Sequence, residues 1–237
     1  MSSRRTAIVT GASGGIGSAL VEGFREHGYS IVATSLGATS SLIPSPSLAL
    51  VDGDIGTQET AVNVAKAAVE KFGSIDVLVN NAGIFRKKAF TDYTTKDFNA
   101  LASTNLLGFL YITQLAVQQM LKQKSGSVVT ISASLADHPI AGINASVSMM
   151  TKGGLNSVTR SLAMEYAKDG IRFNAVAPGA VATALQKNDP ADALNRSPMG
   201  TFADVRDVVQ AVLYLAQASQ VTGEVLHVDG GAHVGRW

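Results

Sequence analysis

The sequence contains no cysteine among its 237 residues. This absence excludes a disulfide framework and any metal site built on thiolates, and no metal-binding motif is predicted. The charges nearly cancel, because 19 lysines and arginines face 18 aspartates and glutamates, for a formal net charge of +1. A protein that binds nucleic acid needs a strong basic excess or patch. Nucleic acid is therefore not an expected partner.

Long hydrophobic runs are also absent. The first apolar run, Ala7–Val9, gives way to glycines almost at once, so no signal-peptide core is predicted. No stretch approaches the roughly 20 consecutive apolar residues that a membrane helix needs. Hydrophobic residues make up 46% of the chain and charged residues 16%, as in globular proteins with a substantial core. We expect a cytoplasmic enzyme or binding domain without a membrane partner.

Short β-branched runs alternate with longer segments of helical period along the whole chain. Such alternation predicts an α/β fold with a parallel sheet covered on both faces. The only stretch rich in proline and serine, Ser41–Ser47, is too short for a domain linker and leaves little room for a full helix. We therefore predict a single Rossmann-type doubly wound domain over residues 1–237, with about seven strands. The predicted strands are Thr6–Thr10, Ser30–Thr34, Leu48–Val51, Ile75–Val79, Ser127–Ile131, Ile171–Val176 and Glu224–Val228.

Three glycines stand between the first predicted strand and the first predicted helix. The segment T-G-A-S-G-G-I-G places Gly11, Gly15 and Gly17 there. Glycine permits positive φ and close backbone approach, while the start of the helix offers free N–H groups to a pyrophosphate. A glycine triplet alone is a weak signal, but its position between a strand and a helix favours a dinucleotide-binding site.

The spacing G-x-x-x-G-x-G after Thr10 resembles the short-chain dehydrogenase/reductase family. Further segments are similar to motifs of that family and occur in the same order: V-D-G-D-I, N-N-A-G, S-T-N-L-L-G, P-G-A-V-A-T and V-T-G-E-V-L-H-V-D-G-G. The resemblance implies an NAD(P)-dependent oxidoreductase acting on a small carbonyl or alcohol substrate. It assigns the cofactor to Thr10, Gly11, Ser13, Gly15, Ile16, Gly17, Ser35, Asp54, Ile55, Asn81, Ala82, Gly83, Lys152, Pro178, Gly179, Val181 and Thr183.

The choice of dinucleotide depends on the end of the second strand. A carboxylate there would bind the ribose 2′-hydroxyl and select NAD. In this chain the position falls on Ser35, so no acid excludes a 2′-phosphate, but that loop holds no lysine or arginine and Ser13 is neutral. Arg4 and Arg5 are candidate bases for this site, but they are better explained as a solvated N-terminal pair. The sequence favours NADP(H) over NAD(H).

The catalytic motif departs from the family pattern. In the family, a tyrosine four residues before the active-site lysine acts as general acid/base, and the ammonium lowers the pKa of the phenol. Here the lysine is Lys152, the residue four before it is Ser148, and no tyrosine occurs between Tyr111 and Tyr166. The resemblance further implies that Asn105 holds a catalytic water and that Lys152 binds the nicotinamide ribose.

The family also places a carbonyl-binding serine at the end of the fifth strand. Simple counting puts Ala133 at that position, with Ser132 and Ser134 on either side. We predict that Ser134 binds the carbonyl, whereas strand-end capping is an equal alternative for both serines.

Three interpretations of the missing phenol stay open. In the first, Ser148, or a water between Ser148 and Lys152, supplies the proton. In the second, His138 or Asp137 in the loop after the fifth strand substitutes for the tyrosine. In the third, the chain binds a dinucleotide without turnover, as a sensor or a partner subunit. Because losing general acid–base catalysis typically costs about 10²–10⁴-fold, it slows a reductase without abolishing binding. We place the oxidoreductase ahead of the binding protein.

Substrate and assembly are less specified. The resemblance implies that the segment after Thr183 adapts to the substrate and that dimers or tetramers form through helices 95–123 and 148–167. The run F-R-K-K-A-F, residues 85–90, places three bases near the expected site. By resemblance to the ketoacyl carrier-protein reductases of the family, they suggest an acidic or phosphopantetheine-bearing 3-oxoacyl substrate, although a solvated charge run is the more ordinary interpretation.

Overall fold

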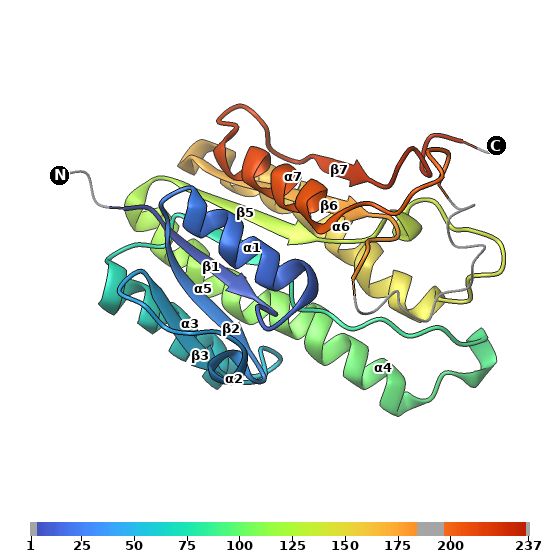
Figure 1. Cartoon of the computed structure of the whole chain (residues 1–237), viewed down its shortest axis with the longest axis horizontal. Coiled ribbons are helices and arrows are strands. Elements are labelled where there is room, and N and C mark those ends of the chain that lie inside the picture. The colour runs from blue at the N-terminus through green and yellow to red at the C-terminus, as the bar shows by residue number, and fades with distance from the viewer. Residues whose placement is uncertain (1–3, 184–196, 236–237) are drawn as a thin grey trace.

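Seven parallel strands form one sheet in the order β3-β2-β1-β4-β5-β6-β7 (Figure 1). The computed structural model describes residues 4–183 and 197–235. All seven predicted strands are confirmed, with bounds that differ from the prediction by at most two residues. The strands are β1 (Thr6–Thr10), β2 (Ser30–Ser35), β3 (Leu48–Asp52), β4 (Val77–Asn80), β5 (Gly126–Ile131), β6 (Ile171–Pro178) and β7 (Val225–Val228).

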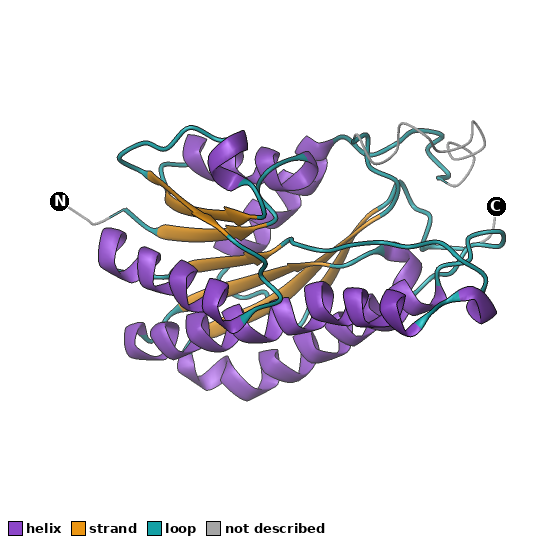
Figure 2. Ribbon diagram, turned by 90° about the horizontal axis from the view of Figure 1, so that it is seen from below, coloured by secondary structure: helices purple, strands orange, loops and turns teal. Residues whose placement is uncertain are grey.

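Helices cover both faces of this sheet (Figure 2). Because side chains alternate along a strand, Ala7 and Val9 pack toward one face and Ile8 toward the other. The first face is covered by α1 (Gly15–Glu26) and α7 (Val205–Gln217). The second is covered by α3 (Gln58–Phe72), α5 (Gly108–Gln123) and α6 (Ser146–Tyr166). The predicted doubly wound α/β fold is confirmed.

The crossover between β2 and β3 holds only a one-turn helix, α2 (Ala38–Ser41). The sequence predicted this shortage, because Pro44 and Pro46 interrupt the few residues available.

One long helical run crosses the second face. It comprises α4 (Thr95–Leu101), a π-helical stretch η2 (Ala102–Leu107) and α5. Within the described residues, this 29-residue run is long and apolar enough to cross a membrane by length and composition alone. A search for consecutive apolar residues does not find this run, because polar residues interrupt it. Leu101, Ile112 and Met120 are fully buried in the protein, as in the core helix of a globular fold.

From β1 the strands are added toward β3 on one side, and from β4 they are added toward β7 on the other side. β1 and β4 are therefore neighbours in the sheet, although β2 and β3 separate them in sequence. In an open parallel sheet, the crevice at the carboxyl ends of strands at such a switch point is the usual ligand site. In Figure 1 the strands point to the right, and the loops that follow β1, β4, β5 and β6 meet at that side.

Candidate functional site

A cavity of about 770 Å³ lies at the carboxyl edge of the sheet. Most of the predicted site residues line it. Three lie just behind its wall instead: Thr10, Asn105 and Ser148. The predicted residues in the lining are Gly11, Ser13, Gly15, Ile16, Gly17, Ser35, Asp54, Ile55, Asn81, Ala82, Gly83, Ser134, Lys152, Pro178, Gly179, Val181 and Thr183.

The glycine loop has the geometry that a pyrophosphate requires. A Cβ atom on Gly17 would lie 2.0 Å from the carbonyl oxygen of Gly11, so no larger residue fits. Gly11 itself has φ +66°, and a Cβ there would lie 2.8 Å from the Cα of Ala82. No side chain caps α1 at Gly14, which leaves N–H groups of its first turn for an anion. The residues present therefore fit a dinucleotide.

Thr10 and Asn81 hold this loop against the end of β4. The Thr10 hydroxyl accepts hydrogen bonds from the backbone N–H groups of Asn81 and Ala82, both at 3.0 Å. The Asn81 amide donates to the carbonyl oxygens of Thr10 at 2.8 Å and Gly11 at 3.1 Å. Within the described structure, the contacts of Thr10 thus position the loop.

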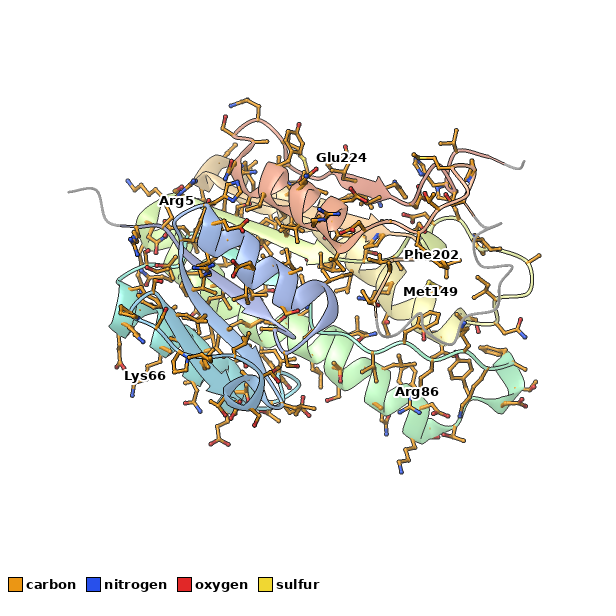
Figure 3. The ribbon with its side chains drawn as sticks, viewed as in Figure 1. Arg5, Lys66, Arg86, Met149, Phe202 and Glu224 are labelled. Atoms are coloured by element: carbon orange, nitrogen blue, oxygen red, sulfur yellow. The ribbon has the colours of Figure 1, made fainter. Side chains whose placement is uncertain are left out.

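Among the described residues, the end of the cavity next to β2 carries hydroxyls and no lysine or arginine. Ser35 lines it, as does Thr34, which was not predicted and whose buried hydroxyl has no partner within the described part of the chain. Arg5 packs over the ring of Tyr29, 4.7 Å from its centroid, at the amino end of β1. Figure 3 shows Arg5 at the opposite end of the molecule from Met149, a residue of the cavity lining. Arg5 is therefore not a cofactor-binding base.

Lys152 is a partly buried cation in the lining of the site. Its Nζ donates to the carbonyl oxygen of Ile131, the last residue of β5, at 2.7 Å. Burial lowers the pKa of this ammonium from 10.5 to about 8. A Cβ on Gly83 would lie 3.2 Å from that Nζ and 3.3 Å from the Asn105 Oδ1, so glycine lets both side chains approach the cavity.

Asn105 lies in the π-helical stretch η2, and such bulges often occur at functional sites. Its Oδ1 accepts from the N–H of Ile84 at 2.9 Å, and its amide donates to the carbonyl of Ile84 at 3.1 Å and to the Thr151 hydroxyl at 2.9 Å. These contacts hold the segment that follows β4. The predicted role of Asn105 in holding a water stays a prediction.

Ser148 makes the same kind of contact with Arg86, two residues after the Ile84 that Asn105 binds. Its hydroxyl accepts from the N–H of Arg86 and donates to the carbonyl of Arg86, both at 2.9 Å. The side chain is buried and does not line the cavity. A proton-donor role for Ser148 stays a prediction, and it requires the hydroxyl to leave these two bonds.

The second interpretation of the missing phenol is not supported. Asp137 accepts from the Asn156 amide at 2.8 Å, and His138 packs 5.6 Å from the ring of His227. Neither Asp137 nor His138 lines the cavity. They belong to a histidine cluster that the sequence could not predict, because its members come from three separate segments.

Both candidate serines line the cavity, but their hydroxyls differ. The Ser132 hydroxyl donates to the carbonyl oxygen of Lys152 at 3.4 Å. No hydrogen bond within the described residues engages the Ser134 hydroxyl, which suits the predicted contact with a substrate carbonyl.

Two of the three bases in residues 86–88 are partly exposed and also form ion pairs within the protein. Arg86 and Lys88 both pair with the buried carboxylate of Asp97, at 2.8 and 2.6 Å, and this lowers the pKa of Asp97, chiefly through Lys88. Lys87, between them, lines the cavity. The pairing with Asp97 was not predicted, because Asp97 belongs to another element, α4, which contacts the bases only in the folded protein. The segment predicted to adapt to the substrate falls largely on residues 184–196, which lie outside the described residues.

A model of the family described as enoyl-(acyl carrier protein) reductase matches residues 11–233. The chain belongs to the short-chain dehydrogenase/reductase family. It is 34% identical to the 3-oxoacyl-[acyl-carrier-protein] reductase of Thermotoga maritima over 96% of this chain and 97% of that protein. Homologues in this family are oxidoreductases, so the predicted enzyme class is confirmed at that level.

Solved structures of family members match the fold over nearly its whole length. A 3-ketoacyl-(acyl-carrier-protein) reductase from Brucella melitensis, complexed with NADH, is 28% identical with a TM-score of 0.91 and coverage of 98% of this chain and 99% of that chain. A gluconate 5-dehydrogenase from Burkholderia cenocepacia, in complex with NADP and tartrate, is 27% identical with a TM-score of 0.90 and coverage of 99% and 97%. These neighbours support a nicotinamide cofactor.

Proposed function

We propose that the protein is an NAD(P)(H)-dependent oxidoreductase that interconverts a carbonyl compound and its alcohol, with proton exchange centred on Lys152. The observation that carries the proposal is the placement of the Lys152 ammonium and the Ser134 hydroxyl in the lining of one cavity with the glycine loop. Cytoplasmic localisation stays a prediction from composition.

The residues divide the chemistry in a simple way. Bound along the glycine loop, a nicotinamide dinucleotide would supply the hydride for the carbonyl carbon. The Ser134 hydroxyl donates a hydrogen bond to the carbonyl oxygen and orients it. The Lys152 ammonium then gives its proton to that oxygen as negative charge develops there. A pKa of about 8 leaves it protonated at neutral pH yet ready to lose the proton.

We further propose that NADP(H) is preferred over NAD(H). Ser35, where a carboxylate would select NAD, carries a hydroxyl and lines the cavity beside Thr34. A 3-oxoacyl thioester on an acidic carrier is less supported than the sequence suggested, because Arg86 and Lys88 are paired with Asp97.

A second candidate function is a dinucleotide-binding sensor or partner subunit. It is favoured by the Ser148 hydroxyl, whose two bonds to Arg86 make it part of the scaffold. Fluorescence titration with NADPH and NADH, followed by a turnover screen of ketones and alcohols, separates the candidates. Binding with turnover supports the enzyme, and binding without turnover, in the Ser148→Tyr variant as well, supports the sensor.

The proton donor is identified by comparing Lys152→Met with Ser148→Ala. If Lys152 is the donor, we expect Lys152→Met to lower kcat by about 10²–10⁴-fold and Ser148→Ala to keep the wild-type inflection of log kcat near pH 8. If Ser148 is the donor, Ser148→Ala lowers kcat by about the same 10²–10⁴-fold at every pH. The pH profile also distinguishes a lost proton donor from a displaced segment around Arg86, because a displaced segment leaves the inflection near pH 8 in place.

A further inference from the structure

The reaction end of the cavity is bordered by apolar side chains. Leu135, Ile140, Ile143 and Met149 line the large cavity beside Ser134 and also form a wall of a second cavity of about 430 Å³. That volume lies within the range of roughly 300–1,000 Å³ typical of small-molecule sites. We call this second cavity the apolar chamber. It adjoins the place where the substrate carbonyl is expected.

The remaining walls of the apolar chamber are also mainly apolar. Phe90, Ala136, Pro139 and Ala145 contribute to them, and Asn144 and Ser146 are the uncharged polar residues in the lining. Among the described residues that line it, Lys88 alone carries a charge, and its ammonium is paired with Asp97. A hydroxylated substrate would lose water there and find few partners in return.

Two polar side chains elsewhere in the lining of the large cavity are engaged within the protein. The Asp229 carboxylate accepts from the N–H groups of Gly231 and His233 and contacts the His233 ring at 2.9 Å. The Ser197 hydroxyl donates to the carbonyl oxygen of Gly230 at 3.3 Å. These two side chains stabilise the turn after β7, and their hydrogen bonds to it would have to break before they could bind the hydroxyls of a polyol.

We infer that the substrate is a ketone, or the matching secondary alcohol, whose carbonyl carbon bears a hydrocarbon body that occupies the apolar chamber. This inference rests on the proposed function. It excludes sugars and small hydroxy acids as preferred substrates, since their hydroxyls would replace hydrocarbon against Leu135 and Met149.

The inference predicts a dependence on chain length. Each methylene group buried against apolar side chains improves binding by about fourfold. For linear 2-alkanones we therefore expect the dissociation constant to fall about fourfold per added methylene, until the chamber is full. Hexoses of similar size are expected to bind without such a trend and with far lower kcat/KM.

The test measures dissociation constants of a 2-alkanone series from the protein saturated with NADP⁺, by calorimetry, together with kcat/KM with NADPH. The Ala136→Phe variant narrows the chamber and is expected to flatten the trend at shorter chains. Phe90→Ala widens it and is expected to extend the trend to longer chains. Ile43→Ala, which truncates an exposed side chain in the β2–β3 crossover, is the matched control and leaves the trend unchanged.

The outcomes are distinguishable from those of the proposed function. Affinity that rises with chain length supports the inference even where turnover is absent, and that result overturns only the catalytic proposal. Nucleotide binding with a flat chain-length profile, or faster reduction of hexoses than of alkanones, overturns the inference and leaves the oxidoreductase intact. Failure to bind either nucleotide overturns both.

Discussion

Lys152 shows, at the scale of one residue, a conflict between stability and function. Its side chain is partly buried, its ammonium donates to the carbonyl oxygen of Ile131, and burial is the cause of its lowered pKa. A charge in such surroundings destabilises the folded chain, because water would solvate it better. The site keeps the charge where the ribose and the substrate oxygen are expected, as functional sites often do at a cost in stability.

We expect Lys152→Met to stabilise the nucleotide-free protein near pH 7. A pKa lowered from 10.5 to about 8 corresponds to roughly 3 kcal/mol, partly offset by the lost hydrogen bond to Ile131. Between pH 8 and 10.5 the unfolded chain keeps a proton that the folded chain has lost, so the wild type gains stability as pH rises. Thermal unfolding at pH 7 and pH 10 checks both points. A variant less stable than the wild type at pH 7 would contradict them.

At the scale of elements, the segment after β4 is held at every second residue. Asn105 holds Ile84, Ser148 holds Arg86, and Asp97 pairs with the Lys88 side chain. Phe85 and Lys87, between the held residues, line the cavity, and so does Ile84. Contacts at every second residue are the period of an extended chain, whose successive side chains point to opposite sides. Ser148 is therefore one of the residues that fix the backbone of this segment of the cavity wall.

The edge strand β7 makes stability depend on pH. His227 stacks on His233 at 4.0 Å, and its pKa is lowered, first by burial and then by the neighbouring imidazole charge, against the opposing carboxylates of Asp229 and Asp137. As pH falls below 6.5, the unfolded chain binds a proton that folded His227 resists, so stability falls.

We expect the melting temperature of the wild type to drop between pH 7 and pH 5, and His227→Gln to drop less. His27→Gln, which replaces the histidine directly after α1, serves as the control and should follow the wild type. A His227→Gln profile parallel to the wild type would refute the assignment.

At the scale of the whole molecule, the long helical run exposes apolar side chains on its outer side. Phe98, Leu107 and Leu110 are each about two-fifths exposed, and Met150 and Met164 on α6 are exposed as well. Such a patch on a globular protein often marks an interface. It fits the dimer or tetramer that the family resemblance implies through these helices.

We expect Leu110→Glu to shift the protein to a smaller species in light scattering coupled to gel filtration. A carboxylate buried without a partner would cost several kcal/mol at such an interface. Leu36→Glu, an exposed position after β2, is the control and should leave the mass unchanged. An unchanged mass for Leu110→Glu would place the interface elsewhere or show a monomer.

Local patterns in the sequence determined the strands, the helix-poor crossover at α2 and the glycine loop. These features can be predicted from the sequence because each depends on residues close together in the chain. Strand alternation and helical period are local, and Gly17 must be glycine because it lies against Gly11. The tertiary structure alone decided which partner each polar side chain takes. Ser148 contacts Arg86 and Lys152 contacts Ile131 across distant parts of the sequence, and His138 joins His227 and His233 in the same way. Asp97 pairs with two bases nine and eleven residues before it. Their hydrogen bonds depend on distances that exist only once the sheet and its helices have packed.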